Sequence, residues 1–224
     1  SKKVMVYKHS FKIRLGIGYC DMKKLVLASA NQHKLQEIQS ILKDFEFELV
    51  TMKAAGYGED DIVESGVTFE ENSMIKAQAV HNRLRVAALA DDSGLEVDCL
   101  EGAPGVYSAR YAGEPKSDKK NNEKLLNAMK DIQSEDRTAR FVTVLTLVFE
   151  NGDALVARGT VEGKIGFEEK GSNGFGYDPL FIVPELGKTF AELTESEKNA
   201  LSHRGNALKV MREEIKRYYE RTGC

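Results

Sequence analysis

Two neighbouring carboxylates, Asp91 and Asp92, stand between an apolar run and the pair Ser93-Gly94. The apolar run, residues 87–90, predicts a buried strand, so both carboxylates should leave the buried end of that strand. Adjacent like charges repel each other and are costly to bury unless something compensates them. A divalent cation would compensate both, and carboxylate oxygens suit Mg²⁺. The alternative is that Asp91 caps the strand end and Asp92 opens a solvated turn.

A polar loop connects a predicted strand to a predicted helix and reads Ser29-Ala30-Asn31-Gln32-His33-Lys34. The backbone N–H groups at the start of that helix, with Ser29, Asn31 and Lys34, would suit a phosphate. It is not a Walker A loop, because it contains no glycine. The alternative is ordinary helix capping by Ser29 or Asn31, with Lys34 in solvent.

An acidic stretch that includes Glu64 precedes a helix carrying Asn72 and Lys76. Because Asn72 and Lys76 are four residues apart, they share one face of the helix and could bind phosphate oxygens together. The alternative is that Glu64 belongs to a solvated acidic loop and that the helix merely has a polar outer face.

A glycine-rich segment, residues 171–179, contains Phe175, Gly176, Tyr177 and Asp178. Glycines allow a backbone to approach a ligand closely, and an aromatic ring in such a loop can stack on a base. The alternative is a glycine-rich turn whose aromatic ring plugs the core below it.

The segment Ser202-His203-Arg204-Gly205 comes just before the last predicted helix, and Lys198 lies five residues before His203. Arginine and histidine side chains can donate hydrogen bonds to carbonyl oxygens on a purine ring. The alternative is that this segment is only the start of a helix.

Hydrophobic periodicity predicts the elements that must position these residues. Apolar or alternating runs predict strands over residues 25–28, 45–50, 86–90, 141–149 and 154–161. Helical spacing predicts helices that begin near residue 31, after Thr68 and at residue 121. It also predicts a last helix beyond residue 205, with one apolar face formed by Leu208, Met211, Ile215 and Tyr218. Ligands of α/β sheets gather at the carboxyl ends of the strands, which is where the predicted strand over residues 86–90 delivers Asp91 and Asp92.

Two local signals refine this prediction. Thr68 followed by Glu71 is a capping box, and the helix that it opens should turn Phe69, Ile75 and Ala79 inward. Glu150-Asn151-Gly152-Asp153 between two strand runs predicts a hairpin. Antiparallel pairing therefore joins the sheet, and a purely parallel Rossmann arrangement is not expected.

Composition excludes several classes of protein. The 224 residues are 42% hydrophobic and carry a net charge of −3, which fits one large α/β domain, or two lobes that share one sheet, with a buried core. The chain has no broad basic surplus of the kind that would indicate nucleic-acid binding. Cys20, Cys99 and Cys224 form no CxxC pair, which argues against a disulfide framework or a zinc site and fits a reducing cytoplasm. No apolar run approaches the roughly 20 residues that span a bilayer, so no membrane partner is expected.

The first 21 residues differ from those that follow. They are basic and carry no sustained helix or strand period, whereas Met22-Lys23-Lys24 opens a clean strand pattern. We interpret residues 1–21 as an N-terminal extension, a leader or cloning-derived segment outside the fold, and residues 22–224 as one domain. A basic arm for a membrane surface or a nucleic acid is the alternative.

Taken together and in order, these segments closely resemble the inosine triphosphate pyrophosphatase family, the Ham1-like nucleoside-triphosphate pyrophosphatases. The resemblance runs from about Lys23 to about Met211. It is carried by the segments at residues 29–34, 68–72, 90–95, 102–111, 174–179 and 202–204. Ser29-Ala30 departs mildly from the Thr-Gly of many members, and residues 1–21 have no counterpart in the family pattern.

The resemblance implies an α/β fold with a long mixed central sheet flanked by helices, and two lobes with an active-site groove between them. It implies hydrolysis of non-canonical purine triphosphates (ITP, dITP, XTP) to the monophosphate and pyrophosphate, with Mg²⁺ as the cofactor and usually a homodimer. Glu64 and Asp92 would bind the metal, Asp92 would accept the proton of water, and Lys76 would neutralise phosphate charge. Substrate binding would fall to Ser29, Ala30, Asn31, Gln32, His33, Lys34, Ser93, Phe175, Gly176, Tyr177, Asp178, Lys198, His203 and Arg204.

Two other functions remain open from the sequence. One is a Maf-like pyrophosphatase for modified nucleotides, although that class has a Ser-Pro-Arg-Arg run where this chain has residues 31–34. The other is a non-catalytic nucleotide-binding module, which the absence of Asp92, Lys76 or Lys34 would have favoured.

Overall fold

The computed structural model describes residues 24–29, 36, 38, 49–56 and 62–222, and the backbone alone of residues 11–15 and 18–22. Within these ranges a seven-stranded sheet runs in the order β4-β3-β5-β6-β7-β8-β9. Its strands are β3 (Leu25–Leu27), β4 (Leu49–Thr51), β5 (Ala87–Val97), β6 (Thr138–Val148), β7 (Ala154–Ile165), β8 (Phe181–Val183) and β9 (Lys188–Thr189).

The sheet is mixed, as the hairpin signal predicted. β3 pairs in parallel with β4 and β5, whereas every pair from β5 to β9 is antiparallel. The hairpin of β6 and β7 turns over residues 149–153, where Gly152 has a φ of 90° and Phe149 N–H donates to Asp153 O at 2.8 Å. A positive φ strains residues other than glycine, so Gly152 suits this turn.

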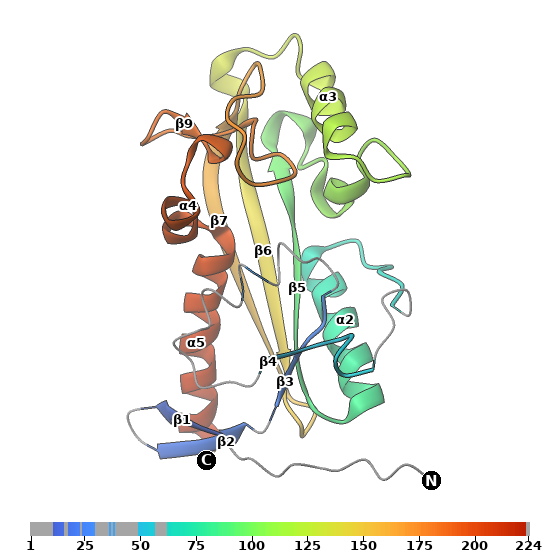
Figure 1. The fold of residues 1–224 in the computed structure, drawn as a ribbon, viewed down its shortest axis with the longest axis vertical. Helices are drawn as coiled ribbons and strands as arrows, with labels where there is room; N and C mark the ends of the chain where they lie inside the picture. The colour runs from blue at the N-terminus through green and yellow to red at the C-terminus, as the bar shows by residue number, and fades with distance from the viewer. Residues whose placement is uncertain are drawn as a thin grey trace.

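Helices cover both faces of the sheet (Figure 1). The longer ones are α2 (Phe69–Leu84), α3 (Asp118–Ala128), α4 (Glu195–Leu201) and α5 (His203–Thr222). Short 3₁₀ turns are η2 (Asp98–Leu100), η3 (Gly105–Arg110), η4 (Ser134–Asp136) and η5 (Phe190–Glu192). No helix in the described ranges is long and apolar enough to cross a membrane.

Side chains alternate between the two faces of each strand, which divides the core into layers. Ala88 and Ala90 of β5 pack with Ala77 and Val80 of α2. On the opposite face, Leu89 and residues of β3, β6 and β7 pack against the apolar stripe of α5, formed by Ala207, Leu208, Met211, Ile215, Tyr218 and Tyr219. The predicted apolar face of the last helix is therefore confirmed.

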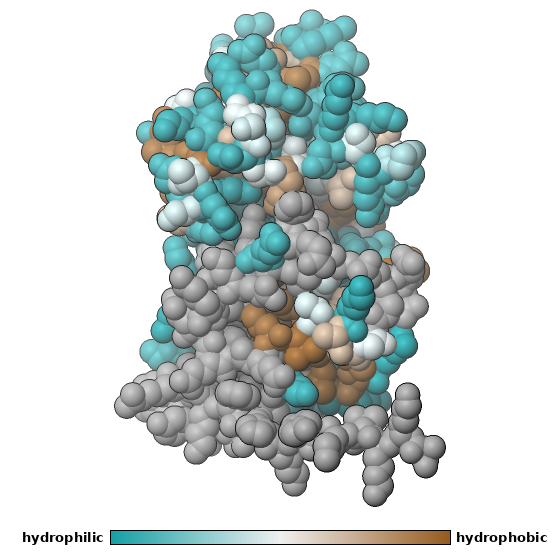
Figure 2. Space-filling model, in the orientation of Figure 1, coloured by the Kyte–Doolittle hydropathy of each residue, from teal (hydrophilic) through white to brown (hydrophobic). Residues whose placement is uncertain are grey.

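The distal half of the sheet has its own core. Leu95 and Val97 of β5 pack there with Leu125 and Met129 from the α3 region and with residues of β6 to β8. Figure 1 shows that the long strands β5, β6 and β7 connect this end, which carries α3 and β9, to the end that carries α2 and α5. Figure 2 shows hydrophilic side chains over most of the α3 end of this face and a gathering of apolar side chains nearer β3 and β4.

β5 does not end where the sequence predicted. The strand was expected over residues 86–90, with Asp91 and Asp92 at its end, but it runs on to Val97. The reason is that β5 has different partners on its two sides. Its parallel partner β3 pairs only as far as Leu89, whereas its antiparallel partner β6 stays paired from Ala88 to Val97. Asp91 and Asp92 therefore lie inside a strand, and Ser93-Gly94 is not a turn.

The start of α2 confirms one half of the predicted capping box. Thr68 is the N-cap, and its hydroxyl accepts a hydrogen bond from Glu71 N–H at 3.1 Å. The Glu71 carboxylate, however, accepts from Val67 N–H at 2.7 Å. The inward residues were partly wrong: Phe69 is buried as predicted, but Ile75 and Ala79 are only half-buried.

The other inward positions of α2 are polar or small, and they are Asn72, Ser73, Lys76, Ala77, Val80 and His81. Apolar spacing could not identify this face, because polar groups of the sheet oppose part of it. Ser73 Oγ, for example, lies 2.7 Å from Thr146 Oγ1 of β6.

Several other predictions concern the chain before residue 62. Gln36 and Ile38 are helical and Ile38 is buried, but the rest of the helix predicted from residue 31 lies outside the described residues. So do residues 45–48 of the predicted strand that ends in β4. The sequence did not suggest β1 (Phe11–Leu15) and β2 (Gly18–Met22), which pair antiparallel in a sheet of their own. β1 lies within the predicted extension, and β2 runs one residue past its predicted end.

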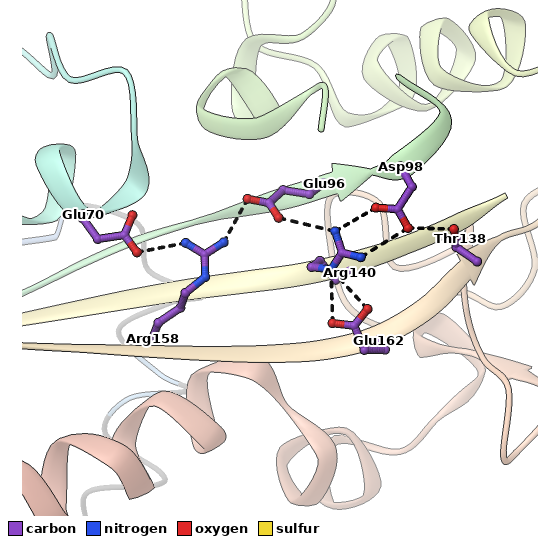
Figure 3. A network of polar contacts seen from close by, with 7 residues as sticks. All are labelled: Glu70, Glu96, Asp98, Thr138, Arg140, Arg158 and Glu162. Atoms are coloured by element: carbon purple, nitrogen blue, oxygen red, sulfur yellow. Dashed lines mark hydrogen bonds and ion pairs between the residues drawn. The ribbon is translucent and has the colours of Figure 1, made fainter. Parts of the chain in front are cut away.

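A network of charged side chains ties α2 to the strands (Figure 3). Arg158 of β7 contacts Glu70 at 2.9 Å and Glu96 at 3.0 Å. Arg140 of β6 contacts Glu96, Asp98 and Glu162, and Asp98 also accepts from Thr138 Oγ1 at 2.7 Å. Hydrogen bonds from Thr138 and then Arg140 lower the pKa of Asp98. The network joins the first turn of α2 to three neighbouring strands.

The first turn of α5 lies directly against β7. A Cβ added to Gly159 would lie 2.2 Å from Ala207 N and 2.3 Å from His203 O. Next to it, Asn206 Nδ2 donates to Thr160 O at 2.9 Å. Because a glycine at 159 permits this approach, it sets the position of the helix turn that carries His203 and Arg204.

We expect Gly159→Ala to lower the free energy of unfolding by about 3 kcal/mol, the upper range for overpacking, because the new methyl group meets backbone atoms. The matched control is Gly187→Ala, whose Cβ would meet nothing within 4 Å and whose φ of 60° gives only backbone strain, about 1 kcal/mol. Urea unfolding of both variants measures the difference. Equal losses would contradict the close-contact explanation.

Candidate active site

Asp91 and Asp92 point to opposite faces of the sheet. Asp92 follows Ala88 and Ala90 on the face covered by α2, and Asp91 follows Ala87 and Leu89 on the face covered by α5. Both are buried, with exposed fractions of 1% for Asp91 and 7% for Asp92. The alternation of β5 therefore separates two charges that the sequence places side by side.

Lys76 of α2 meets two carboxylates on the Asp92 face. Its Nζ donates to Asp92 Oδ1 at 3.1 Å and lies 3.5 Å from Glu64 Oε2. Burial lowers the pKa of Lys76, but the combined attraction of Asp92, Asp91 and Glu64 outweighs burial and leaves that pKa above its ordinary value. Lys76 is therefore positively charged. Its contacts bring together the three charged residues predicted for this face, which are Glu64, Lys76 and Asp92.

The same donor set fits a small divalent cation. Glu64 and Asp92 approach one point from different segments, and Mg²⁺ is commonly held by one or two carboxylates together with water and substrate phosphates. Within the described ranges, no group of three or more His, Cys, Asp or Glu side chains is arranged to hold a metal ion. Any ion here would therefore need ligands beyond the described His, Cys, Asp and Glu side chains.

Asp91 anchors a second polar cluster on the α5 face. Ser93 Oγ donates to Asp91 Oδ2 at 2.9 Å and lies 2.9 Å from Thr143 Oγ1, so Thr143 is the donor in the latter bond. Arg204 Nε lies 3.7 Å from Asp91 Oδ2, and Arg204 Nη2 donates to Ser93 Oγ at 3.3 Å. Burial lowers the pKa of Arg204 to about 10, which still leaves it charged at neutral pH.

The two clusters lie on either face of a stretch of β5 whose edge toward β3 is paired with no described strand. On the β3 side, Ala28 N–H donates to Leu89 O, and farther along β5 Leu95 N–H donates to Ser108 Oγ at 2.9 Å. No described strand pairs with β5 on this side between these two points. A ligand lying along this edge can reach Asp92 on one face and Ser93 on the other.

Ser29 stands at the same edge. It follows Ala28 directly, is half-buried and comes at the carboxyl end of β3, where the predicted phosphate loop begins. The other predicted residues of that loop, Ala30, Asn31, Gln32, His33 and Lys34, lie outside the described residues.

The glycine-rich segment forms a compact loop around Asp178. Its carboxylate Oδ2 accepts from Phe175 N–H at 3.0 Å and from Lys198 Nζ of α4 at 2.7 Å. Burial raises the pKa of Asp178, although the Lys198 ammonium works in the opposite direction. Lys198 Nζ also lies 4.9 Å from the centre of the Phe175 ring. The structure thus brings three predicted substrate-binding residues into one cluster.

A row of aromatic rings leads from this cluster to α5. Lys198 Nζ lies 5.9 Å from the Phe190 ring, Phe190 stacks on Phe141 at 5.5 Å, and Phe141 stacks on His203 at 5.1 Å. His203 and Arg204 are the first two residues of α5, whereas the sequence placed them just ahead of this helix. Lys198 and His203, which were both predicted to contact the base, are therefore joined through the rings of Phe190 and Phe141.

Two side chains behave differently from the sequence interpretation. The Tyr177 ring is buried in the distal core and its hydroxyl donates to Ser108 O at 2.8 Å, so a ligand would meet its backbone. Burial also raises the pKa of Tyr177.

Thr143 was not singled out, although a polar residue inside the apolar run of residues 141–149 is a signal that could have identified it.

We expect Asp91→Asn to lower the free energy of unfolding by about 3–5 kcal/mol, because it removes the carboxylate beside a buried guanidinium. The double variant Asp91→Asn/Arg204→Met should recover part of that loss, since it also removes the buried positive charge. Denaturant unfolding of the two single variants and the double variant completes the cycle. Strictly additive losses would contradict a direct interaction of these two side chains.

Comparisons with known proteins place this geometry in a family. Residues 25–214 match the Ham1 family. A dITP/XTP pyrophosphatase of Clostridium perfringens is 50% identical over 201 residues, covering 87% of this chain and 98% of the relative, and one of Escherichia coli is 48% identical over 192 residues, covering 85% and 96%. The Ham1 protein of Staphylococcus aureus has a solved structure that superposes with a TM-score of 0.78 at 42% identity, covering 87% of this chain and 98% of that one. The chain belongs to the Ham1 family.

Proposed function

We propose that this protein hydrolyses non-canonical purine nucleoside triphosphates (ITP, dITP and XTP) to the monophosphate and pyrophosphate. The observation that carries the proposal is the Lys76 ammonium held between Glu64 and Asp92, beside an edge of β5 that no described strand pairs. Relatives that are half identical over most of the chain are named dITP/XTP pyrophosphatases. That name favours this function over a Maf-like pyrophosphatase or a non-catalytic nucleotide-binding module.

The phosphates would lie at the carboxyl end of β3, next to Asp92. Cleavage of a triphosphate depends mainly on neutralising charge and positioning water. Lys76 would supply a fixed positive charge, and Ser29 with residues 30–34 would supply further donors. Asp92 would accept the proton of the attacking water, as a carboxylate can when it lies within hydrogen-bond reach of that water.

Glu64 and Asp92 would hold Mg²⁺, since two carboxylate donors and a bound triphosphate suit its oxygen preference. When bound, the ion supplies charge neutralisation at phosphate oxygens and acidifies water. Lys76 would then contact phosphate oxygens as well as the carboxylates that now surround it.

The base would lie against the Asp178 cluster. Phe175 supplies a ring for stacking, and Lys198, His203 and Arg204 supply N–H donors. ITP and XTP carry an oxygen at the 6-position, where ATP carries an amine. An unpaired buried donor costs roughly 1–3 kcal/mol, so these donors would favour a 6-oxo base over a 6-amino base.

A homodimer, a cytoplasmic location and the absence of nucleic-acid and membrane partners complete the proposal. The homodimer is the usual assembly implied by the resemblance, and the sparse cysteines fit a reducing compartment. Residues 1–21 stay outside the proposed catalytic domain.

Release of pyrophosphate from ITP, XTP, dITP, ATP and GTP, with and without Mg²⁺, tests the function. We expect release only with Mg²⁺ and faster turnover of the 6-oxo purines ITP, XTP and dITP than of ATP. GTP, which also carries a 6-oxo group, shows whether the 2-amino group is tolerated. Release of orthophosphate alone, or equal rates with ITP and ATP, would refute the proposal.

Asp92→Asn should fold normally and lose at least about 99% of the turnover of ITP, since removal of a general base costs roughly 10²–10⁴ in rate. The matched control is Asp131→Asn, an exposed carboxylate outside the site that should keep the original rate. Steady-state kinetics and circular dichroism measure turnover and folding. Near-normal hydrolysis by Asp92→Asn would exclude Asp92 as the base.

A further inference from the structure

We infer that Asp118 and Asn122 of α3 are positioning residues for the loop that binds the base, and that they set base affinity without touching the substrate. This inference rests on the proposed function. Neither residue was a candidate in the sequence, because both lie in a polar segment that looks like an ordinary helix start.

The two side chains hold both sides of Gly176. Asp118 Oδ2 accepts from Gly176 N–H at 2.8 Å, and Asn122 Nδ2 donates to Gly176 O at 3.1 Å. Asp118 and Asn122 are four residues apart in a helix, so they project from the same face. Gly176 has a φ of 63° and lies between Phe175 and Tyr177, so its backbone conformation determines where the Phe175 ring points. We name this arrangement the Gly176 clamp.

The clamp is connected to the strand that carries Asp92. Asn121 Nδ2 donates to Ser108 O and Ala109 O, and its Oδ1 accepts from Ala112 N–H at 2.7 Å. Ser108 O also accepts from the Tyr177 hydroxyl, and Ser108 Oγ accepts from Leu95 N–H of β5 at 2.9 Å. The start of α3 thereby links the Phe175 loop, through η3, to β5.

The geometry of Asn122 argues for a role beyond helix stability. The residue is 3% exposed, and its Oδ1 has no hydrogen-bond partner within the described part of the chain. A buried acceptor without a partner is costly, and an apolar side chain would avoid that cost. The Asn122 carboxamide does donate to Gly176 O. We infer that this hydrogen bond, which holds the Gly176 peptide, offsets the free-energy cost of burying the unpaired Oδ1.

The consequence for catalysis is specific. If the clamp is lost, the Phe175 loop samples other positions and the base is bound less tightly, while Lys76, Glu64 and Asp92 keep their geometry. We therefore expect a rise in KM for ITP with little change in kcat, and a smaller ratio of ITP to ATP hydrolysis.

The test compares Asp118→Ala and Asn122→Ala with the matched controls Asp131→Ala and Asn127→Ala, which are exposed at or just beyond the other end of α3. Loss of one such hydrogen bond should raise the KM for ITP about tenfold, with kcat within about twofold. Asp118→Asn should have a smaller effect, because its amide oxygen can still accept from Gly176 N–H. This conservative variant also serves if Asp118→Ala fails to fold.

Amide hydrogen exchange at Gly176, followed by NMR, gives a readout that does not depend on activity. Asp118→Ala should accelerate exchange of this amide about tenfold or more relative to Asp131→Ala, since the amide loses its acceptor. A loss of folded protein alone would lower apparent kcat and leave KM unchanged, so that pattern would overturn the inference. Unchanged exchange at Gly176, or faster exchange with unchanged KM, would overturn it too.

The outcomes separate this inference from the proposed function. Failure of the unaltered protein to hydrolyse ITP refutes the proposed function and, with it, the role of the clamp in catalysis. Normal hydrolysis by the unaltered protein, together with clamp variants that match their controls, refutes the clamp alone.

Discussion

The arrangement of the site depends on the unequal pairing of β5. Its parallel partner stops at Leu89, whereas its antiparallel partner β6 continues to Val97. The strand therefore stays extended through Asp91, Asp92 and Ser93, while no described strand pairs with its other edge there. A rigid strand with an accessible edge can present side chains of both faces to a single ligand, which a strand buried on both edges cannot do.

Buried charge is the second constraint, and each buried ion is compensated in its own way. Lys76 lies between two carboxylates, Arg204 lies beside Asp91, and Lys198 lies on Asp178. Arg137 uses backbone instead: it is buried and donates to the carbonyl oxygens of Met129, Ile132, Ile165 and Gly166. The first three ions line the proposed substrate path, and Arg137 joins the end of α3 to the end of β7. Such pairs stabilise little by themselves, but removing one partner is costly, so they define one geometry.

The distal end of the sheet depends on side-chain contacts to backbone atoms. Asn121, Asn122, Asp118 and Tyr177 each bond a peptide group of η3 or of the Phe175 loop. Loops have no regular backbone hydrogen bonds to pair their N–H and C=O groups. Here polar side chains, most of them from α3, form hydrogen bonds with these groups instead. The proposed base site is therefore only as well ordered as the first two turns of α3.

The sequence by itself determined the alternation of strands and helices, the β6–β7 hairpin, the apolar face of α5, the Thr68 cap and the family. The family follows from the resemblance of several segments taken in order, and the other features follow from local spacing and turn chemistry, which neighbouring residues dictate. Tertiary structure decided the length of β5, the polar inward face of α2, the separation of Asp91 from Asp92 and the recruitment of Asp118 and Asn122. Each of these depends on which segment lies opposite in space: β6 keeps β5 extended, Thr146 and Asp92 face α2, and Gly176 lies 58 residues from Asp118. Because that information resides in contacts between distant parts of the chain, residue spacing alone could not supply it.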